Sequence, residues 1–306
     1  MKIFLNSPKE NWIVDRLVDE WYIYNPEIST KEIETSDLVW IISPWTWNKL
    51  NKKKLLRKKV ICTIHHIDPT KFNLNEFSLL DEVVDFYHVI SKKTIDELKK
   101  VTDKKIFYSP FWIDSKKWFD IPNKEQLRKK NMLDPSAYLV GSFQRDTEKG
   151  RKKLPKLEKG PDIFIEAVKQ LSSKHHNLEV ILTGIRRDFI MSELKKLKIK
   201  FYYLGMVDYI KLNQLYNCLD LYIVSSRIEG GPAAILECAI TKTPIVSTDV
   251  GIASEVLNAK SIYNQQDFLK AVPNIEYAYS SIKKFTIPLG FESFIKFFEE
   301  IYENKH

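Results

Sequence analysis

The sequence predicts an α/β protein built from two Rossmann-like domains, each with a parallel sheet, that face a central cleft. Short apolar runs typical of strands alternate with amphipathic stretches along the chain of 306 residues, and this alternation is the pattern of parallel α/β architecture. A polar, proline-containing segment at 120–136 interrupts the alternation and separates two such sets. In folds of this class, ligands bind outside the carboxyl ends of the strands.

The first half supplies one set of strands and helices. Strands are expected at residues 3–5, 38–42, 60–64, 87–90 and 106–108. Helical stretches include 9–23 and 92–101. We expect an N-terminal domain over residues 1–125.

The second half repeats the pattern with different glycine content. Strands are expected at 138–143, 178–183, 200–204, 221–225 and 244–248. Helices are expected at 161–174, 188–198, 209–218, 231–241 and 252–258. This predicts a second domain over 137–287. Residues 288–306 are expected to form a C-terminal helix, and packing of this helix back onto the N-terminal domain is one option.

Composition excludes several classes of protein. The chain is 44 % apolar and 29 % charged, as in a globular protein with a substantial core, so disordered and collagen-like chains are excluded. No apolar run is long enough to span a bilayer, and Pro8, Lys9 and Glu10 interrupt any signal-peptide core, so a cytoplasmic location is expected. The three cysteines form neither a disulfide framework nor a zinc pattern, and no metal cluster is visible.

The net charge of +8 is spread evenly. Residues 1–140 carry 24 basic and 20 acidic residues, and the remainder carries the same numbers. An even distribution argues against a nucleic-acid-binding surface, so no nucleic-acid partner is expected. Two local concentrations are the run Lys52–Lys59 and a cluster of Lys149, Arg151, Lys152, Lys153, Lys156 and Lys159. Each is interpreted either as a solvated face or as a candidate contact for an anionic ligand or membrane.

Glycine and tryptophan are distributed in opposite ways. Residues 1–140 contain none of the 9 glycines, and no tryptophan lies beyond Trp118. The glycine-rich phosphate loops G-x-G-x-x-G and G-x-x-x-x-G-K-[ST] are therefore unavailable. Any phosphate-binding site is expected in the second half.

The segment 225–237 carries the densest functional pattern. An apolar strand leads to Gly230-Gly231, and Pro232 stands at the first position of a predicted helix. Glycine allows close approach of a ligand to the backbone, and the N–H groups of a helix N-terminus suit an anion such as a diphosphate. Glu229 and Glu237 flank this turn. Their spacing recurs elsewhere by chance, but the strand, turn and helix between them distinguish this pair.

Three further segments accompany this pattern. They are Thr243-Pro-Ile-Val-Ser-Thr-Asp-Val-Gly251, Gly141-Ser-Phe-Gln-Arg145 and Lys159-Gly160. With Glu229-Gly-Gly-Pro-Ala-Ala-Ile-Leu-Glu237, they resemble the donor site of the glycosyltransferase family 4 (group 1) enzymes. The specific part of the resemblance covers about 139–257. It implies the GT-B fold and transfer of a sugar from a nucleotide diphosphate donor with retention at the anomeric carbon.

The resemblance also implies a role for each matched residue. Arg145 and Lys159 would hold the donor diphosphate and neutralise its charge. Glu229 and the Gly230-Gly231 backbone would hold the transferred sugar, and Glu237 would accept hydrogen bonds from ribose hydroxyls. Further expected donor contacts are Pro232, Gly205 and Met206. The alternatives are that Arg145 and Lys159 are surface cations and that Glu229 is a helix-start carboxylate stabilised by the helix dipole.

The resemblance is weaker in the first half. Val60-Ile-Cys-Thr-Ile-His65-His66 resembles the family's strand that ends in a donor-facing histidine, with His65 preferred over the adjacent His66 and a structural histidine as the alternative. The glycine-rich first loop of many relatives is absent, because Asn6-Ser7-Pro8-Lys9 stands there.

Trp45 and Trp47 follow a predicted strand and precede the basic Lys52–Lys59 run. An aromatic and basic segment suits an acceptor sugar, a lipid-linked acceptor or an anionic membrane. Core tryptophans beside a solvated lysine-rich helix are the alternative.

Together these features predict a retaining, metal-independent, hexosyl-type glycosyltransferase with an acceptor-side first domain and a donor-binding second domain. The donor substrate would be a nucleotide diphosphate sugar, with no separate cofactor. The acceptor would be a glycan or a lipid-linked carbohydrate in cell-surface polysaccharide or glycoconjugate synthesis, with peripheral contact at the inner face of the plasma membrane. No first-half carboxylate stands at a nucleophile position, which fits a front-face mechanism in which the departing phosphate deprotonates the acceptor. The alternative is a catalytically inactive nucleotide-sugar-binding module that acts with a partner enzyme.

Overall fold

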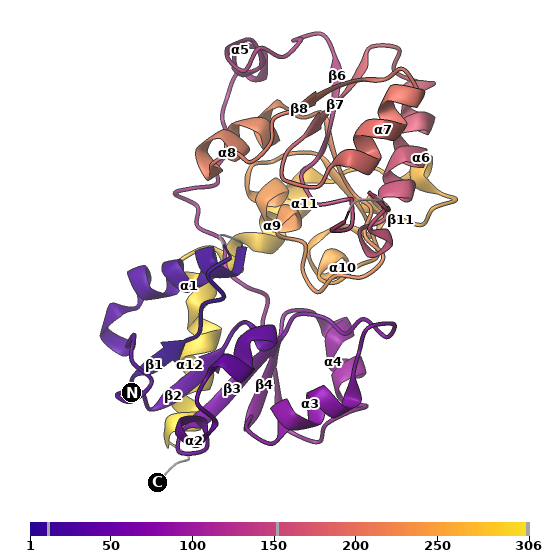
Figure 1. The fold of residues 1–306 in the computed structure, drawn as a ribbon. Coiled ribbons are helices and arrows are strands. Elements are labelled where there is room, and N and C mark those ends of the chain that lie inside the picture. The colour runs from indigo at the N-terminus through magenta and orange to yellow at the C-terminus, as the bar shows by residue number, and fades with distance from the viewer. Residues whose placement is uncertain (11–12, 151–152, 304–306) are drawn as a thin grey trace. The chain divides into compact units, whose positions relative to one another are not determined.

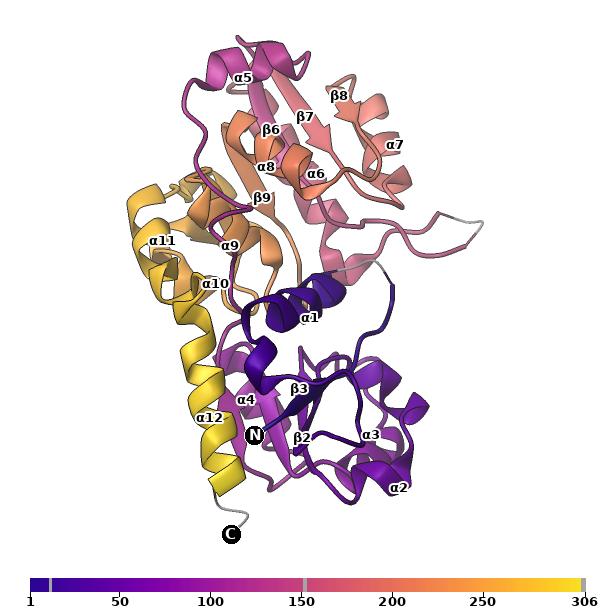
Figure 2. The ribbon, with the colours of Figure 1, turned by 90° about the vertical axis from the view of Figure 1, so that its left-hand side faces the viewer.

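The computed structural model describes residues 1–10, 13–150 and 153–303. The chain forms two compact units: Met1–Trp112 with the C-terminal segment from Ile287, and Ile113–Thr286. Each unit contains one sheet in which all neighbouring strands are parallel. Figure 1 and Figure 2 show helices packed around each sheet. The predicted class, two Rossmann-like α/β domains, is confirmed.

The first unit contains a five-stranded sheet in the order β1-β2-β3-β4-β5. The strands are β1 (Ile3–Leu5), β2 (Leu38–Ile41), β3 (Lys59–Ile64), β4 (Phe86–Val89) and β5 (Ile106–Tyr108). The described helices are α1 (Ile13–Tyr24), α2 (Lys52–Leu55), α3 (Leu74–Asp81), α4 (Lys92–Leu98) and α12 (Glu292–Glu303), with the 3₁₀ helices η1 (Pro26–Ile28), η2 (Pro44–Lys49) and η7 (Leu289–Phe291).

Helices α1 and α12 cover one face of this sheet, and α2, α3 and α4 contribute to the core on the other. Trp21 of α1 is fully buried and packs against Trp40 of β2 and Phe298 of α12, at centroid distances of 5.5 and 5.6 Å. The C-terminal helix therefore forms part of the first unit's core, although it follows the whole second unit in the chain.

The second unit contains a six-stranded sheet in the order β11-β10-β9-β6-β7-β8. The strands are β6 (Tyr138–Ser142), β7 (Leu178–Leu182), β8 (Lys200–Tyr203), β9 (Leu221–Val224), β10 (Ile245–Thr248) and β11 (Ile262–Tyr263). The described helices are α5 (Lys124–Lys130), α6 (Pro161–Ser172), α7 (Asp188–Lys196), α8 (Tyr209–Cys218), α9 (Ala233–Ile240), α10 (Ala253–Val256) and α11 (Ile275–Ile282), with η3 (Leu157–Lys159), η4 (Ala259–Ser261), η5 (Phe268–Lys270) and η6 (Lys283–Phe285).

The order of these strands creates a topological switch point between β6 and β9. The chain runs outward from β6 through β7 to β8, and then returns to place β9 on the other side of β6. At such a point the connections from two adjacent strands leave in opposite directions and open a crevice at their carboxyl ends. The loops after β6 and β9 are thus placed where this fold binds ligands.

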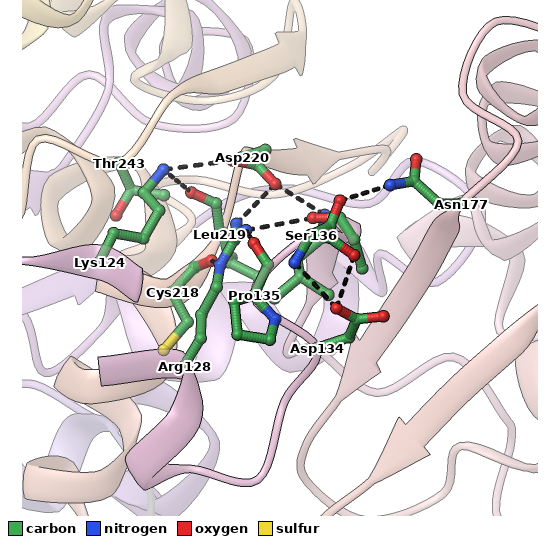
Figure 3. Close-up of polar contacts among 12 residues, drawn as sticks. Lys124, Arg128, Asp134, Pro135, Ser136, Asn177, Cys218, Leu219, Asp220 and Thr243 are labelled. Atoms are coloured by element: carbon green, nitrogen blue, oxygen red, sulfur yellow. Dashed lines mark hydrogen bonds and ion pairs between the residues drawn. The ribbon is translucent and has the colours of Figure 1, made fainter. Parts of the chain in front are cut away.

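The polar segment at 120–136 is part of the second unit. Arg128 of α5 is buried; its Nε donates to the Cys218 carbonyl at 2.8 Å, and one of its terminal nitrogens pairs with Asp220 Oδ2 at 2.6 Å. Its other terminal nitrogen donates to the carbonyls of Pro135 and Ala137, each at 3.1 Å. Figure 3 shows Arg128 among these partners, with Lys124 contacting Asp220 from the other side of the carboxylate. The interruption seen in the sequence is therefore an ordered, ion-paired segment.

The predicted strands are all present, and each end lies within one residue of its predicted position. Strand β11 was not predicted, because two residues carry no periodic pattern. The helix expected from residue 9 is described from Ile13, and Lys9 and Glu10 lie outside it, where their backbone N–H groups donate to the Asp15 carboxylate. No described helix combines the length and apolar character needed to cross a membrane.

Candidate functional site

The candidate site is built on the loops that follow β6 and β9 at the switch point. The loop after β6 carries Gln144 and Arg145, and the loop after β9 leads from Ser225 to the start of α9. Both side chains of the first loop are partly exposed. Lys159, at the end of η3, is the third contributor, and it lies just before α6.

The Lys159-Gly160 turn is held tightly against the end of β9. Gly160 has a φ of 58°, and a Cβ on it would lie 1.8 Å from the Ser225 carbonyl oxygen. Only glycine fits this left-handed position at that separation. The Lys159 carbonyl accepts hydrogen bonds from Gln144 Nε2 at 3.0 Å and from Ser225 Oγ at 3.1 Å. The three loops are therefore connected through one backbone carbonyl.

Lys159 and Glu229, both predicted site residues, form an ion pair between Nζ and Oε1. Their side chains are 20 % and 15 % exposed, so the pair is accessible from one side. Ser226 Oγ lies 3.0 Å from Glu229 Oε2 and 3.2 Å from Gln144 Oε1. Its single hydrogen serves one of these acceptors at a time. A cation and a carboxylate thus meet at the strand ends, as a site for a charged sugar donor requires.

A second ion pair holds this loop to the start of α6. Arg227 makes a two-point contact with Asp162, at 2.8 and 2.6 Å, and also donates to the Leu157 carbonyl at 2.9 Å. The backbone N–H groups of Arg227 and Ile228 donate to the Glu158 carbonyl at 2.8 and 3.2 Å. These contacts position Glu229 against Lys159. The sequence reading missed Arg227 and Asp162, because their pairing joins positions 65 residues apart.

The turn between the two glutamates is closely packed. Gly251 has a φ of 51°, and a Cβ on it would lie 2.1 Å from the Gly230 carbonyl oxygen. Gly230 is buried and Gly231 is partly exposed, and neither has a positive φ. Pro232 is the N-cap residue and α9 begins at Ala233, so the prediction that Pro232 is the first helical residue is wrong by one position.

Glu237 is buried in α9 at 5 % exposure. Its Oε2 accepts a hydrogen bond from the Tyr216 hydroxyl at 2.8 Å. Burial and the neighbouring Glu237 raise the pKa of Tyr216, so this phenol stays a donor. The Tyr216 ring also packs against Phe143, which lies directly after β6. Tyr216 was not predicted as a site residue, since nothing in the sequence aligns α8 with the second turn of α9.

Arg145 is half-buried, and the next residue in its loop, Asp146, forms a buried ion pair that holds the loop in place. Arg187 Nε lies 2.6 Å from Asp146 Oδ2, and both side chains are almost completely buried. Burial raises the pKa of Asp146 and lowers that of Arg187, while their mutual attraction opposes both shifts.

Gly205, another predicted donor contact, follows β8 with a φ of 63°, and its carbonyl accepts a hydrogen bond from the Gly184 N–H at 2.7 Å. Met206 is 67 % exposed beside it.

His65 belongs to the first unit and directly follows β3. Its Nε2 lies 2.9 Å from the Ile42 carbonyl, and its ring packs beside Trp45 and Phe111. Burial lowers the pKa of His65 to about 4. The ring is therefore neutral at pH 7, with Nε2 donating to Ile42 and Nδ1 left as an acceptor.

Three of the six basic residues in each basic concentration are ion-paired among the described residues. In the first, Lys52 pairs with Glu82 at 2.6 Å, Lys59 pairs with Asp85 at 3.6 Å, and Lys54 pairs with Glu34. In the second, Lys153 and Lys156 contact Asp188, Glu148 and Glu158. Arg151 and Lys152 lie outside the described residues. Among those described, no group of three or more His, Cys, Asp or Glu side chains is placed to hold a metal ion.

Residues 155–292 match the sequence model of a family described as glycosyl transferases, group 1. Residues 155–292 belong to the group 1 glycosyltransferases. The Lys159–Glu229 pair, the Arg227 clamp and Glu237 all lie within this matched part. The narrower assignment to family 4 stays a prediction.

Two similar curated proteins are glycosyltransferases. The lipopolysaccharide core biosynthesis mannosyltransferase LpsB of Rhizobium meliloti is 28 % identical over 156 residues, which are 49 % of this chain and 42 % of that protein. The O-antigen chain mannosyltransferase RfbU of Salmonella typhimurium is 25 % identical over 290 residues, which are 85 % of this chain and 78 % of RfbU. The chain spans under half the length of LpsB.

Solved structures share the fold of the whole chain. Anabaena Alr3699/HepE, crystallised in complex with UDP, superposes with a TM-score of 0.75 over 98 % of this chain and 99 % of that one, at 13 % identity. Sucrose-phosphate synthase from Thermosynechococcus elongatus superposes with a TM-score of 0.68 over 98 % of this chain and 80 % of that one. The chain that contains the matched residues 155–292 therefore has the GT-B fold.

Proposed function

We propose that this chain transfers a hexosyl-type sugar from a nucleotide diphosphate donor to a glycan or lipid-linked acceptor in cell-surface polysaccharide synthesis, with retention of configuration. The observation that carries the proposal is the Lys159–Glu229 pair at the β6–β9 switch point, inside the part of the chain that matches the group 1 family. The mannosyltransferase relatives and the UDP complex of HepE support the same class of reaction and donor.

In this proposal the donor diphosphate lies against Lys159, Arg145 and the N-terminus of α9. As the bond between the anomeric carbon and the phosphate oxygen breaks, negative charge grows on the diphosphate. Lys159 and Arg145 stabilise that charge. Cations that are already positioned in this way contribute much of the rate enhancement when a phosphate is the leaving group. The backbone of Lys159 is already held in place, because its carbonyl accepts hydrogen bonds from Gln144 and Ser225.

Glu229 and the Gly230-Gly231 backbone would hold the transferred sugar through its hydroxyl groups. Glu237, oriented by Tyr216, would accept from the ribose hydroxyls of the donor. The acceptor hydroxyl proton passes to the departing phosphate oxygen on the same face of the sugar, so the protein supplies position and charge stabilisation rather than a nucleophile. His65 is a candidate contact for a sugar hydroxyl through Nδ1.

The test has two stages. Thermal-shift measurements with a panel of nucleotide sugars identify the donor, because a ligand that binds only the folded state raises its apparent stability. Donor hydrolysis and transfer are then measured for Lys159→Ala and Glu229→Ala. Lys153→Ala is the control, since Lys153 is 65 % exposed and pairs with Asp188 outside the site.

We expect both site variants to lose transfer and the control to retain it. Donor binding without turnover on any acceptor would instead support the inactive module. Absence of a thermal shift with every nucleotide diphosphate would contradict the donor site itself.

A further inference from the structure

Trp45 stands apart from the other described tryptophans of the first unit. Trp21, Trp40 and Trp112 are fully buried, whereas Trp45 is 50 % exposed. Trp47, two residues later, is only partly exposed and packs against the buried cluster on the α2–α3 face. The exposed indole of Trp45 offers a large, flat apolar surface on which a ligand can pack.

The indole ring of Trp45 is held in place at both ends. Its Nε1 donates to Glu10 Oε1 at 3.3 Å, and its ring lies 5.7 Å from the His65 ring at an interplanar angle of 45°. A ring restrained in this way loses little further conformational entropy when a ligand packs on it.

The backbone around Trp45 is also fixed, by Asn6. Asn6 Nδ2 donates to Thr46 Oγ1 at 2.8 Å, and Asn6 Oδ1 accepts from the Ser43 N–H at 3.1 Å. Asn6 is buried, and it stands in the loop that contains no glycine. The loop after β1 therefore supports the loop after β2 through side-chain hydrogen bonds.

The groups beside the ring suit a carbohydrate. Glu10, Trp45 and His65 follow β1, β2 and β3, which are neighbouring parallel strands, so they lie at the same sheet edge. The Glu10 carboxylate has acceptor capacity beyond the indole contact, and His65 has Nδ1. A pyranose ring offers an apolar C–H face for the indole and hydroxyl donors for these two acceptors.

The same groups do not suit a membrane. Lipid-binding surfaces combine protruding apolar side chains with unpaired basic residues. Here an acidic residue holds the exposed indole and the second tryptophan packs inward. Three of the six basic residues in the Lys52–Lys59 run, Lys52, Lys54 and Lys59, are paired with carboxylates.

We propose that Trp45, Glu10 and His65 form a subsite for a hexose residue of the acceptor, with the sugar ring stacked on the Trp45 indole. The assignment to the acceptor rests on the function proposed above. Sugar binding at this subsite can be measured without the transfer reaction.

The experiment is saturation-transfer NMR on the full chain with methyl α-mannoside, methyl α-glucoside and N-acetylglucosamine as probes. The variants are Trp45→Ala, Trp45→Phe and Glu10→Ala. The matched control is Ile23→Ala, because Ile23 is an exposed apolar residue of the same unit, on α1. Each variant is also tested for a thermal shift with the nucleotide sugars and for sedimentation with phosphatidylcholine–phosphatidylglycerol vesicles.

We expect at least one probe to bind the wild type, and Trp45→Ala to raise its dissociation constant about tenfold, since one aromatic contact is worth on the order of 1 kcal/mol or more. Trp45→Phe should restore most of the binding, and Ile23→Ala should match the wild type. Equal binding by Trp45→Ala and wild type, no binding of any probe, or Trp45-dependent binding to vesicles alone would overturn the proposal. A wild-type chain that binds the probes but no nucleotide sugar would instead contradict the function proposed above.

Discussion

Lys159 Nζ and the Glu229 carboxylate are ion-paired, although 70 residues separate them in the chain. The Lys159-Gly160 turn and the loop after β9 bring them together at the switch point of the second sheet. A diphosphate that binds Lys159 must share or replace Glu229 as its partner. The pair therefore couples binding of the donor's phosphates to the placement of the carboxylate proposed to hold its sugar.

This coupling predicts opposite effects of Glu229→Gln on two measurements. Transfer should fall about 100-fold or more, the cost typical of a lost transition-state contact. Binding of the nucleoside diphosphate product should stay equal or become tighter, because Lys159 loses its competing carboxylate. Steady-state kinetics and titration calorimetry measure the two effects. Glu166→Gln, which alters an exposed Glu–Lys pair on α6, should change neither. If Glu229→Gln weakened product binding as much as transfer, Glu229 and the diphosphate would not compete for Lys159.

Gly160→Ala should cost more stability than Gly205→Ala. Both glycines have a positive φ, so each substitution places an L side chain in the left-handed region at about 1–2 kcal/mol. Only at Gly160 would the Cβ also collide with the Ser225 carbonyl, while nothing lies within 4 Å of a Cβ at Gly205. Urea unfolding measures the difference between the two variants. Equal losses would show that close packing of the Lys159 turn on β9 contributes nothing.

Arg128→Ala should lower the free energy of unfolding by about 3–5 kcal/mol. The substitution removes a buried cation from Asp220 and leaves three carbonyl oxygens without their donor (Figure 3). Lys129→Ala is the matched control. Lys129 is 63 % exposed and pairs with Glu125 one turn away, so its loss should change the free energy of unfolding far less than the loss of Arg128. Chemical denaturation of both variants tests the contrast, and similar losses would argue against a structural role for α5.

Stability should decrease as pH falls from about 6.5 toward 4. Burial lowers the pKa of His65 to about 4 and that of His88 to about 3. Unfolded histidines bind a proton near pH 6.5, so in this range the unfolded chain binds more protons than the native chain. Each histidine then contributes up to about 1.4 kcal/mol per pH unit.

Urea unfolding at several pH values between neutrality and pH 5 measures this slope. His65→Asn should reduce this slope, because it removes one of the two buried histidines. An unchanged slope in His65→Asn would show that His65 takes up its proton equally in both states.

Local patterns were sufficient to predict the α/β class, the two parallel sheets and most element boundaries. Strands β2 and β9 are continuous apolar runs followed by polar or glycine-containing loops, so the signal that predicts them lies within a short stretch of sequence. The same holds for Glu229, Gly230-Gly231 and Glu237, whose neighbouring strand and helix are adjacent in sequence. These features follow from periodicity and turn chemistry, which depend on nearest neighbours along the chain.

The contacts that complete the site depended on the tertiary structure. Tyr216 meets Glu237 because α8 and α9 pack on the same sheet, and Arg227 meets Asp162 because β9 ends beside the start of α6. In the first unit, Trp45 is exposed while Trp40 and Trp21 are buried. Their burial depends on the order of strands in the sheet and on the return of α12 to its face. The order of the strands and the position of α12 are decided by packing between segments that are distant in the sequence. No local pattern therefore predicts which tryptophan is buried.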